Sequence, residues 1–199
     1  MNRDDLRELH FITPIENLPS IWTNGILSHK KAAALKPKSI ADPRMQERRR
    51  LKGVPGGKRL HEYANLYFCG RNPMLFRRLN ERKGICVLSV STDVLDLEGV
   101  VVTDCNAASE YVRFYPSPDG LKNVDHELTF AEWWTDAEDP INEYRQKSAK
   151  CAEVLVPDCV EPKFISGAYV CNQSVCQRIA GLDSGITVTI NRHLFFGRT

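Results

Sequence analysis

Short apolar runs alternate with helix-like stretches along this chain, but the intervals between them are uneven. The clearest β-type runs are ICVLSVS at 85–91 and VVVT at 100–103, both rich in apolar and β-branched residues. A doubly wound Rossmann fold needs strands and helices in regular alternation. Because these intervals are irregular, we expect an α+β domain built on a mixed sheet.

Local signals predict the other elements. Thr13 as N-cap, Pro14 and Glu16 form a capping box, which predicts a helix directly after a strand at 9–12. A short helix is expected from Asp42 through the arginines that follow it. The remaining expectations are strands at 66–69, 152–157, 164–170, 186–190 and 194–196, and helices at 73–82, 129–135, 139–150 and 172–182.

The length and composition are those of one globular unit. A chain of 199 residues with 42% hydrophobic content can bury one sizeable core, so we expect a single domain over residues 1–199. Seven cysteines without CxxC spacing favour reduced thiols over a disulfide framework. The N-terminus has no apolar leader and no stretch is long enough to span a membrane. These features predict a cytoplasmic protein without membrane contact.

Positive charge is concentrated in residues 36–59. This segment holds nine lysines and arginines against two acids, a balance of +7, whereas the whole chain carries only +2. His61, Tyr63 and Tyr67 follow closely. Arginines bind phosphates through paired donors and aromatic rings stack on bases, so the segment suits single-stranded nucleic acid. A solvated cationic loop explains the charge equally simply.

Glu153 is the acid most open to a chemical role. It stands directly before the apolar run Val154–Val156, at the mouth of an expected buried strand. There it faces either solvent or a cleft in which it could act on a proton or a hydroxyl. GVPGG at 53–57 lacks the spacing of a phosphate-binding loop, and five scattered histidines show no metal-ligand spacing. We therefore expect no metal site.

The chain resembles the DarT family, bacterial toxins that transfer ADP-ribose from NAD+ to bases in single-stranded DNA. The motifs that carry the resemblance keep their order along the chain: FITPIENLPSIWTNGIL, QERRRLKGVPGG, LHEY, LYFCGRNPMLF, VVTDCNA and KCAEVLVP. The resemblance implies an ADP-ribosyltransferase-like split mixed β-sheet with flanking helices, and NAD+ in the cleft. It also implies an antitoxin partner that removes ADP-ribose, commonly a macrodomain protein.

Residue roles follow from the same resemblance. Glu153 falls on the family's catalytic glutamate, which would bind the 2′-hydroxyl of the nicotinamide ribose. Arg49 falls on its second catalytic group, which would stabilise negative charge on the base as its proton leaves. Arg48 and Arg50 would then contact DNA phosphates.

Further positions of the family's pocket have counterparts here. His10, Thr13, Asn17, His61 and Tyr67 are the residues that we expect to bind NAD+. The histidine of the first strand is displaced by one residue, because Phe11 occupies the place two before Thr13 that relatives often give to histidine. Since strand side chains alternate between faces, this shift turns His10 away from the pocket unless the strand is bulged.

The DNA side of the pocket leaves the target base open. Arg71 and Asn106 fall on positions that would contact the substrate DNA, and Asn106 stands where some relatives have histidine. The resemblance therefore implies modification of either thymidine or guanosine. Two alternatives to this function are a non-catalytic module that binds single-stranded nucleic acid, and an ADP-ribosyltransferase that acts on RNA or protein.

Overall fold

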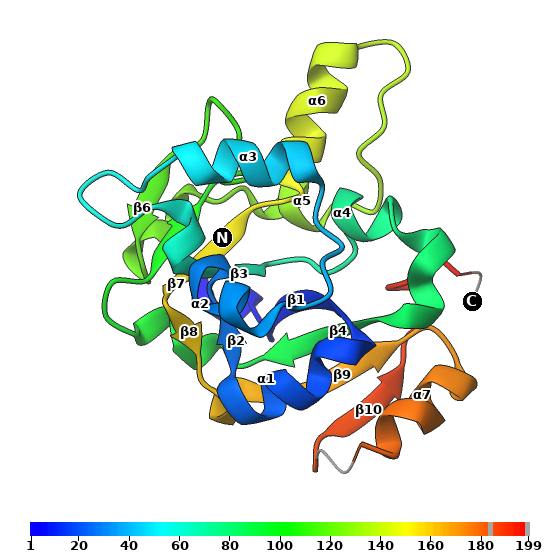
Figure 1. Cartoon of the computed structure of the whole chain (residues 1–199). Coiled ribbons are helices and arrows are strands. Elements are labelled where there is room, and N and C mark those ends of the chain that lie inside the picture. The colour runs from blue at the N-terminus through cyan, green and yellow to red at the C-terminus, as the bar shows by residue number, and fades with distance from the viewer. Residues whose placement is uncertain (183–184, 198–199) are drawn as a thin grey trace.

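The computed structural model describes residues 1–182 and 185–197. Within these ranges the chain forms short strands and short helices that interleave throughout (Figure 1). The strands are β1 (Leu9–Pro14), β2 (Ile26–Leu27), β3 (Tyr63–Tyr67), β4 (Ile85–Val90), β5 (Val101–Thr103), β6 (Phe114–Pro116), β7 (Glu153–Pro157), β8 (Cys159–Val160), β9 (Ile165–Val170) and β10 (Thr187–Ile190).

Seven α-helices are described in those ranges, together with several 3-10 turns. The helices are α1 (Leu18–Asn24), α2 (His29–Ala32), α3 (Pro43–Leu51), α4 (Pro73–Phe76), α5 (His126–Phe130), α6 (Pro140–Ala149) and α7 (Gln173–Ala180). The 3-10 turns are Arg3–Asp5, Ile15–Asn17, Ala33–Leu35, Leu60–Glu62, Leu79–Gly84, Thr92–Asp96, Asp119–Asn123 and Pro162–Phe164.

Eight strands form one sheet in the order β10-β9-β4-β1-β3-β7-β5-β6, and β2 pairs with β8 separately. β10 runs parallel to β9, whereas the other neighbouring strands of the sheet are antiparallel. The sheet is therefore mixed and the domain is α+β, which confirms the fold class predicted from the irregular spacing.

The sheet is nearly divided at its centre, between β1 and β3. β1 pairs with β4 along its whole length, from Leu9 opposite Val90 to Pro14 opposite Ile85. With β3 it shares a single pair, His10 opposite Tyr67. Within residues 1–182 and 185–197, no further strand pair joins the two halves of the sheet, which is the split arrangement that the family resemblance implied.

β4 lies at the centre of the hydrophobic core. All six of its residues are buried, because helices and turns cover both faces of the sheet there. A strand that is buried on both faces reads as a continuous apolar run, and this explains why ICVLSVS was the clearest strand signal in the sequence. The core extends from this strand into β1, β3, β7 and β9.

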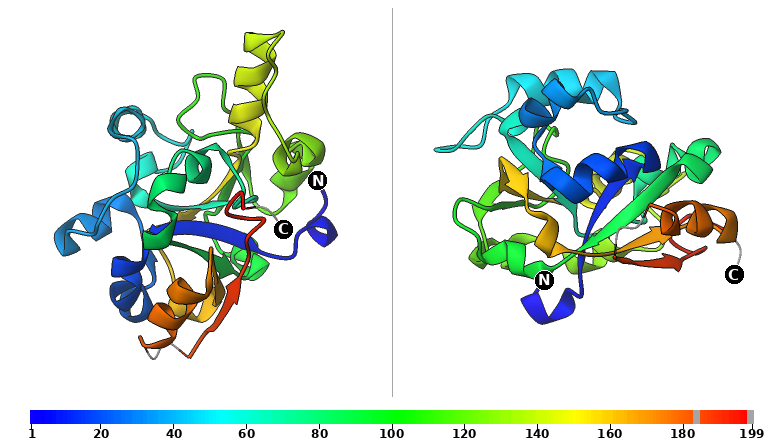
Figure 2. Two further views of the ribbon diagram at one scale, coloured as in Figure 1. Left: turned by 90° about the vertical axis from the view of Figure 1, so that its right-hand side faces the viewer. Right: turned by 60° about the horizontal axis from the view of Figure 1, so that its bottom comes forward.

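The helices differ in how closely they pack on the sheet. α3 crosses above the sheet near β3, whereas α6 projects away from the body (Figure 1). Residues 28–60 run along one side of the molecule, and β10 and α7 lie at a different end (Figure 2). Residues 25–62, which join α1 to β3, therefore lie together on the side that carries α3. We call them the cover segment.

The predicted capping box at Thr13 is wrong. β1 continues through Thr13 to Pro14, where the ladder with β4 ends opposite Cys86 and Ile85. A 3-10 turn follows, and no side chain caps it. Strand pairing outweighs the local helix signal, because all six residues of β1 pair with the buried strand β4.

Other expected boundaries shift for similar reasons. The strand expected at 66–69 lies at Tyr63–Tyr67, because β3 pairs with β7 over those residues. The helix expected at 73–82 ends at Phe76 and gives way to a 3-10 turn. The helix expected at 129–135 lies earlier, at His126–Phe130, because the Asp125 side chain caps it by accepting the Leu128 N–H.

The chain end also differs from expectation. Residues 194–196 form turns instead of a strand, and Leu194 and Phe195 are buried against the main core. Residues 183–184 and 198–199, which the expected single domain includes, lie outside the described residues. Within the described part of the chain, no helix is both long enough and apolar enough to cross a membrane.

Gly25 gives a test of the packing between β2 and β8. It ends α1 with φ 77°, and a Cβ there would lie 2.2 Å from the Val160 carbonyl oxygen and 2.9 Å from Cys159 Sγ. We expect Gly25→Ala to lower the free energy of unfolding by roughly 1–3 kcal/mol, measured by urea denaturation. Gly84→Ala is the control, because a Cβ at Gly84 meets no atom within 4 Å. Equal stability of both variants would contradict this packing.

Candidate active site

A cavity of about 850 Å³ lies where the two halves of the sheet separate. Its walls come from β1, β3, α6 and the cover segment, which includes α3. Several of these elements are far apart in sequence. Clefts of this size are typical of small-molecule and cofactor sites. Of the side chains expected to bind or react, those that line the cavity are Thr13, Asn17, Arg48, Arg49, His61, Tyr67 and Asn106.

Glu153 lies directly behind the cavity wall. It is the first residue of β7 and is fully buried, so it does not face open solvent. Its Oε1 accepts a hydrogen bond of 3.0 Å from Arg49 Nη1 and another of 3.0 Å from the Ala107 main-chain N–H. Arg49 lines the cavity and contacts Glu153, so the guanidinium separates the carboxylate from the cavity.

The ion pair is only partly satisfied. Among the described residues, Glu153 Oε2 and Arg49 Nη2 are buried and have no hydrogen-bond partner. Buried polar atoms of native proteins nearly always have partners, and an unpartnered one costs free energy. One free acceptor and one free donor beside an 850 Å³ cavity fit a bound polar ligand that supplies both partners.

Burial and the carboxylate together set the protonation of the site. Burial lowers the pKa of the Arg49 guanidinium, but the adjacent Glu153 carboxylate outweighs it, and the net pKa of Arg49 is raised. Burial and the same carboxylate raise the pKa of the Tyr67 hydroxyl. Arg49 is therefore a fixed cation and Tyr67 a neutral phenol at the cavity wall.

α3 brings Arg49 to the cavity. The Asp42 side chain caps the helix and Pro43 occupies its first position, as is typical of helix starts. Met45, Arg48 and Arg49 line the cavity, because residues three and four apart share one face of a helix. This confirms the short helix expected after Asp42.

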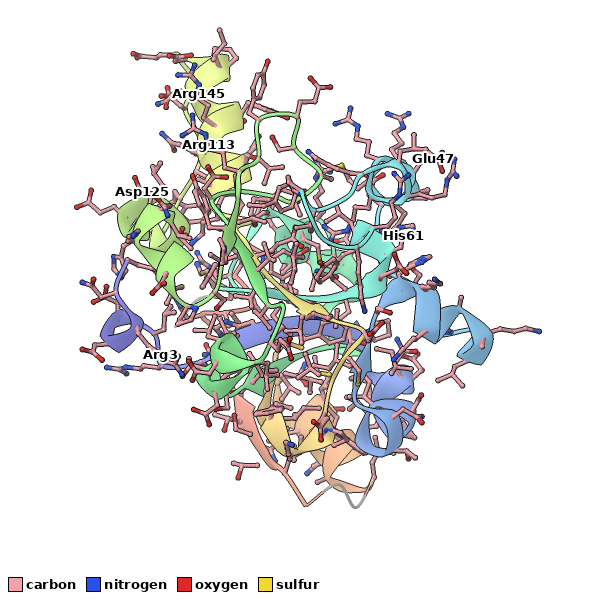
Figure 3. All side chains as sticks on the ribbon, turned by 90° about the vertical axis from the view of Figure 1, so that its left-hand side faces the viewer. Arg3, Glu47, His61, Arg113, Asp125 and Arg145 are labelled. Carbon is pink, nitrogen blue, oxygen red and sulfur yellow. The ribbon has the colours of Figure 1, made fainter. Side chains whose placement is uncertain are left out.

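Arg50 points elsewhere. Its guanidinium binds Glu47 three residues earlier, with Nη2 2.6 Å from Oε1, and both side chains are largely exposed. Figure 3 shows Glu47 on the outer side of α3. The structure thus places Arg50 outside the cavity lining, unlike its neighbours Arg48 and Arg49.

His61 contacts two other residues of the cover segment, His29 and Gln46. Its ring stacks on that of His29, with centroids 4.0 Å apart, and its Nε2 lies 3.2 Å from Gln46 Oε1. Burial, followed by the charges of His29 and Arg49, lowers the pKa of His61. At neutral pH the ring is therefore an uncharged part of the cavity wall.

Asn17, the last residue of the 3-10 turn before α1, ties the cover segment to the end of β1. Its side-chain amide donates to the Lys38 carbonyl oxygen at 2.9 Å and accepts the Lys38 N–H at 3.0 Å. The same amide nitrogen also donates to Thr13 Oγ1 at 3.2 Å. Thr13 and Asn17 thus border the cavity, and Asn17 holds the main chain that closes over it.

The structure does not bring His10 to the cavity. Its Nδ1 lies 3.2 Å from the Phe68 carbonyl oxygen and its Nε2 lies 3.2 Å from Glu8 Oε1. Phe11 lines the cavity instead. The expectation that His10 binds the nucleotide is therefore not supported, because regular strand alternation turns it away, as the one-residue shift implied.

Glu8 is the centre of the network that holds His10. Burial raises the pKa of Glu8, but hydrogen bonds from His10, Ser89 and Tyr169 outweigh it and lower that pKa to about 2. The Tyr169 hydroxyl donates to Glu8 Oε1 at 2.8 Å, and Ser89 Oγ contacts Oε2. The network connects the chain before β1 to β4 and β9.

Arg71 also lies outside the cavity lining. Its Nη1 donates to the His193 carbonyl oxygen at 2.8 Å and its Nη2 donates to Glu132 at 2.8 Å. The guanidinium stacks over the Phe196 ring at 4.0 Å. The side chain is mostly buried and fastens the C-terminal turns to residue 132, so the expected DNA contact from Arg71 is not supported.

Asn106 does reach the cavity, although its side chain also shapes a turn. Its Oδ1 accepts the Ala108 N–H at 2.9 Å, and its own N–H donates to the Ser148 carbonyl oxygen at 3.0 Å. Sequence reasoning missed two neighbours, Thr103 and Ala107, which hydrogen-bond Glu153. The Ala107 donor is a main-chain amide and leaves no side-chain signal in a sequence.

The fold and the site define the class of the protein. A mixed sheet divided at its centre, with a buried glutamate and arginine beside the resulting cavity, is an ADP-ribosyltransferase-like α+β domain. A family model described as "ssDNA thymidine ADP-ribosyltransferase, DarT" matches residues 10–196. The chain belongs to the DarT family.

Individual relatives agree with this assignment. A DNA ADP-ribosyl transferase of Thermus sp. (strain 2.9) is 32% identical, over 86% of this chain and 84% of that protein. A structure of Thermus sp. 2.9 DarT in complex with ADP-ribosylated ssDNA has a TM-score of 0.81 and 26% identity, and covers 98% of each chain.

A longer relative contains a second activity. The Thermosipho africanus DNA ADP-ribosyl transferase–DNA ADP-ribosyl glycohydrolase fusion protein is 33% identical over 87% of this chain. This chain spans 45% of that protein, about half its length. The structure of Thermosipho africanus DarTG in complex with ADP-ribose has a TM-score of 0.83 and 32% identity, and covers 96% of this chain and 51% of that chain.

The position of His10 leads to a prediction. His10→Ala removes one of the three side chains that contact the Glu8 carboxylate and also the contact with the Phe68 carbonyl oxygen, so we expect it to lower the free energy of unfolding by about 1–3 kcal/mol. NAD+ affinity, measured by calorimetry, should stay at the wild-type value because the ring does not line the cavity. His126→Ala, at an exposed histidine of α5, is the control. A selective loss of NAD+ affinity in His10→Ala would place that ring in the nucleotide site.

Proposed function

We propose that this chain transfers ADP-ribose from NAD+ to a base in single-stranded DNA. The observation that carries the proposal is the buried Glu153–Arg49 pair behind the cavity wall, in which one carboxylate oxygen and one guanidinium nitrogen lack partners. Relatives that match nearly all of this chain were solved with ADP-ribose and with ADP-ribosylated ssDNA. NAD+ is the co-substrate that donates the ADP-ribose.

The reaction is a displacement at the anomeric carbon of the nicotinamide ribose. Glu153 Oε2 accepts a hydrogen bond from the ribose 2′-hydroxyl once Arg49 no longer covers it. The carboxylate charge stabilises the oxocarbenium-like sugar as the bond to nicotinamide breaks and its electron pair leaves with that ring. A base nitrogen then forms the new bond to the anomeric carbon and releases its proton to solvent, so that neutral nicotinamide and one proton leave for each ADP-ribose transferred.

We propose that Arg49 acts on the base. It lines the cavity on the side of α3, and its pKa is raised, so it stays charged throughout. A fixed cation stabilises the negative charge that develops on the base as the proton leaves. Thr13, Asn17, His61 and Tyr67 border the same space and are the residues that we propose for NAD+.

The DNA strand reaches the cavity beside α3. Arg48 lines the opening, and residues 36–59 supply the excess positive charge. Asn106, in the turn after β5, also lines the cavity and is proposed to contact the substrate base. We propose thymidine as that base, because the family description names it; guanosine is the alternative outcome of the oligonucleotide assay below.

A toxin of this kind needs a counterpart that reverses the modification. The Thermosipho relative joins the transferase to a DNA ADP-ribosyl glycohydrolase in one protein. We propose that this chain, acting in the cytoplasm as a single domain, is the toxin of a toxin–antitoxin pair. Its antitoxin partner removes ADP-ribose from DNA, either as a separate macrodomain-type protein or as a similar enzyme.

Glu153→Gln tests whether the chain is an enzyme. The change keeps the size of the side chain and removes the charge that stabilises the oxocarbenium-like sugar, so we expect the modification rate to fall by about 10²–10⁴-fold. The measurement is mass spectrometry of oligonucleotides that differ at one base, after incubation with NAD+. DNA affinity should be retained.

Glu47→Gln, at an exposed acid on the outer side of α3, is the matched control and should modify DNA at the wild-type rate. If the wild-type chain binds single-stranded DNA and leaves every oligonucleotide unmodified, the chain is a binding module. Transfer to RNA or protein in place of DNA, followed with labelled NAD+, would instead reveal a different acceptor.

Arg49→Ala tests the role of the cation. If Arg49 acts on the base in the transition state, the rate should fall by about 10²-fold or more while NAD+ affinity changes little. The variant leaves Glu153 buried without its partner, which costs stability, so NAD+ binding stoichiometry by calorimetry should define the folded fraction. Arg7→Ala, at an exposed arginine, is the control. Parallel losses of rate and NAD+ affinity would make Arg49 a phosphate-binding residue.

A further inference from the structure

β3 pairs with β7 on one side of Glu153, and on the β5 side a hydroxyl group binds the Glu153 main chain. Thr103, the last residue of β5, is fully buried, and its Oγ1 accepts the Glu153 N–H at 3.0 Å. The same oxygen lies 2.6 Å from the Cys105 carbonyl oxygen, to which it donates. Thr103 therefore connects the first residue of β7 to the turn formed by residues 103–107.

This hydroxyl takes the place of a sheet hydrogen bond. β5 pairs with β7 at Val101 opposite Leu155 and at Val102 opposite Val154, and the pairing stops there. The next residues along the two strands are Thr103 and Glu153. Because the side chain accepts the Glu153 N–H, the main chain after Thr103 is free to turn back over the Glu153 side chain.

The turn returns with a donor aimed at the carboxylate. The Ala107 N–H donates to Glu153 Oε1 at 3.0 Å, and Ala107 is fully buried. The preceding N–H, that of Asn106, donates to the Ser148 carbonyl oxygen at 3.0 Å and so fixes the turn to the end of α6. The position of the Ala107 amide is thus set by bonds on both sides of the turn.

The two donors to Glu153 use the same oxygen. Oε1 accepts from Arg49 and from Ala107, whereas Oε2 has no partner among the described residues. If Arg49 leaves the carboxylate when the co-substrate binds, the Ala107 amide remains and still holds Oε1. The hydrogen bond from Ala107 then keeps the carboxylate from rotating, and only Oε2 is free to accept a hydrogen bond from a substrate hydroxyl.

We propose that Thr103 is a positioning residue for Glu153, which acts by holding the 103–107 turn so that the Ala107 amide selects Oε2 as the reactive oxygen. This proposal rests on the proposed function, in which Glu153 binds the ribose hydroxyl. Thr103 is fully buried and is not among the residues that line the cavity. Its effect should therefore appear in the chemical step more than in binding.

Thr103→Val is the test, because valine keeps the shape of threonine and removes the hydroxyl. We expect kcat for DNA modification to fall by about 10-fold or more, with the KM for NAD+ within about 3-fold of the wild type, as is typical when a catalytic group is misplaced. Thr103→Ser, which restores the hydroxyl, should recover most of kcat. A purely structural role would lower the folded fraction and leave kcat per NAD+ binding site unchanged.

Thr129→Val is the matched control. Thr129 is also fully buried, but its Oγ1 has no hydrogen-bond partner among residues 1–182 and 185–197. Replacing an unsatisfied buried hydroxyl with a methyl group costs little or nothing. We expect this variant to keep the wild-type kcat, so that loss of a buried hydroxyl in general is separated from loss of this one.

A second measurement needs no variant. In the folded wild-type chain the amide protons of Glu153 and Ala107 should exchange slowly with solvent, as followed by nuclear magnetic resonance, because both are buried and hydrogen-bonded. Rapid exchange at Ala107, or full kcat in Thr103→Val, would overturn the proposal. A wild-type chain that modifies no DNA would instead reject the proposed function, which is a distinct result.

Discussion

The buried ion pair between Arg49 and Glu153 joins the two parts of the molecule that make the site. Glu153 belongs to β7 in the sheet and Arg49 to α3 in the cover segment, 104 residues earlier. Leaving either charge buried alone costs roughly 3–5 kcal/mol. The pair therefore requires α3 to sit against the sheet, and with α3 come Met45 and Arg48 along the same wall. A buried ion pair adds little net stability, because removing both charges from water offsets their attraction. The Arg49–Glu153 pair nevertheless fixes where the two functional groups lie.

The division of the sheet explains why a cavity exists at that place. β1 and β3 share one pair, so beyond it the facing edges of the two strands separate and leave a space between the two halves of the sheet. Phe11 and Thr13 from one half and Tyr63, Asn65 and Tyr67 from the other half line that space. Because the strands themselves are buried and well paired on their other sides, these side chains are fixed before any ligand arrives. The site is thus largely preformed, as is usual for small-molecule sites.

The sequence predicted the parts of the fold whose signals are local. The continuous apolar run of β4 and the cap of α3 at Asp42 are examples, and Glu153 was recognised from its place before an apolar strand. Signals that depend on distant partners failed: Thr13 has a good capping sequence, but pairing with β4 keeps it in a strand. Arg71 and His10 have polar side chains typical of ligand contacts, yet each contacts a main-chain carbonyl oxygen far away in sequence, that of His193 and that of Phe68. The Ala107 amide could not be predicted at all, since every residue except proline carries that donor.

The cover segment shows how a basic, apolar-poor stretch becomes ordered. Polar contacts join it to the rest of the chain: the Asn17 amide binds both main-chain groups of Lys38, and Lys52 donates to the Ser109 carbonyl oxygen. Ile40, Val54 and Leu60 add buried apolar contacts. Hydrogen bonds of this kind contribute about 0.5–1.5 kcal/mol each, much less than burial of an apolar side chain in the core. α3 itself buries only Arg49 among its nine residues, so Arg49 is delivered to the buried carboxylate by a helix that is held less firmly than the sheet. A segment with that balance of contacts can both define the closed arrangement and release Glu153 when a substrate hydroxyl replaces the guanidinium.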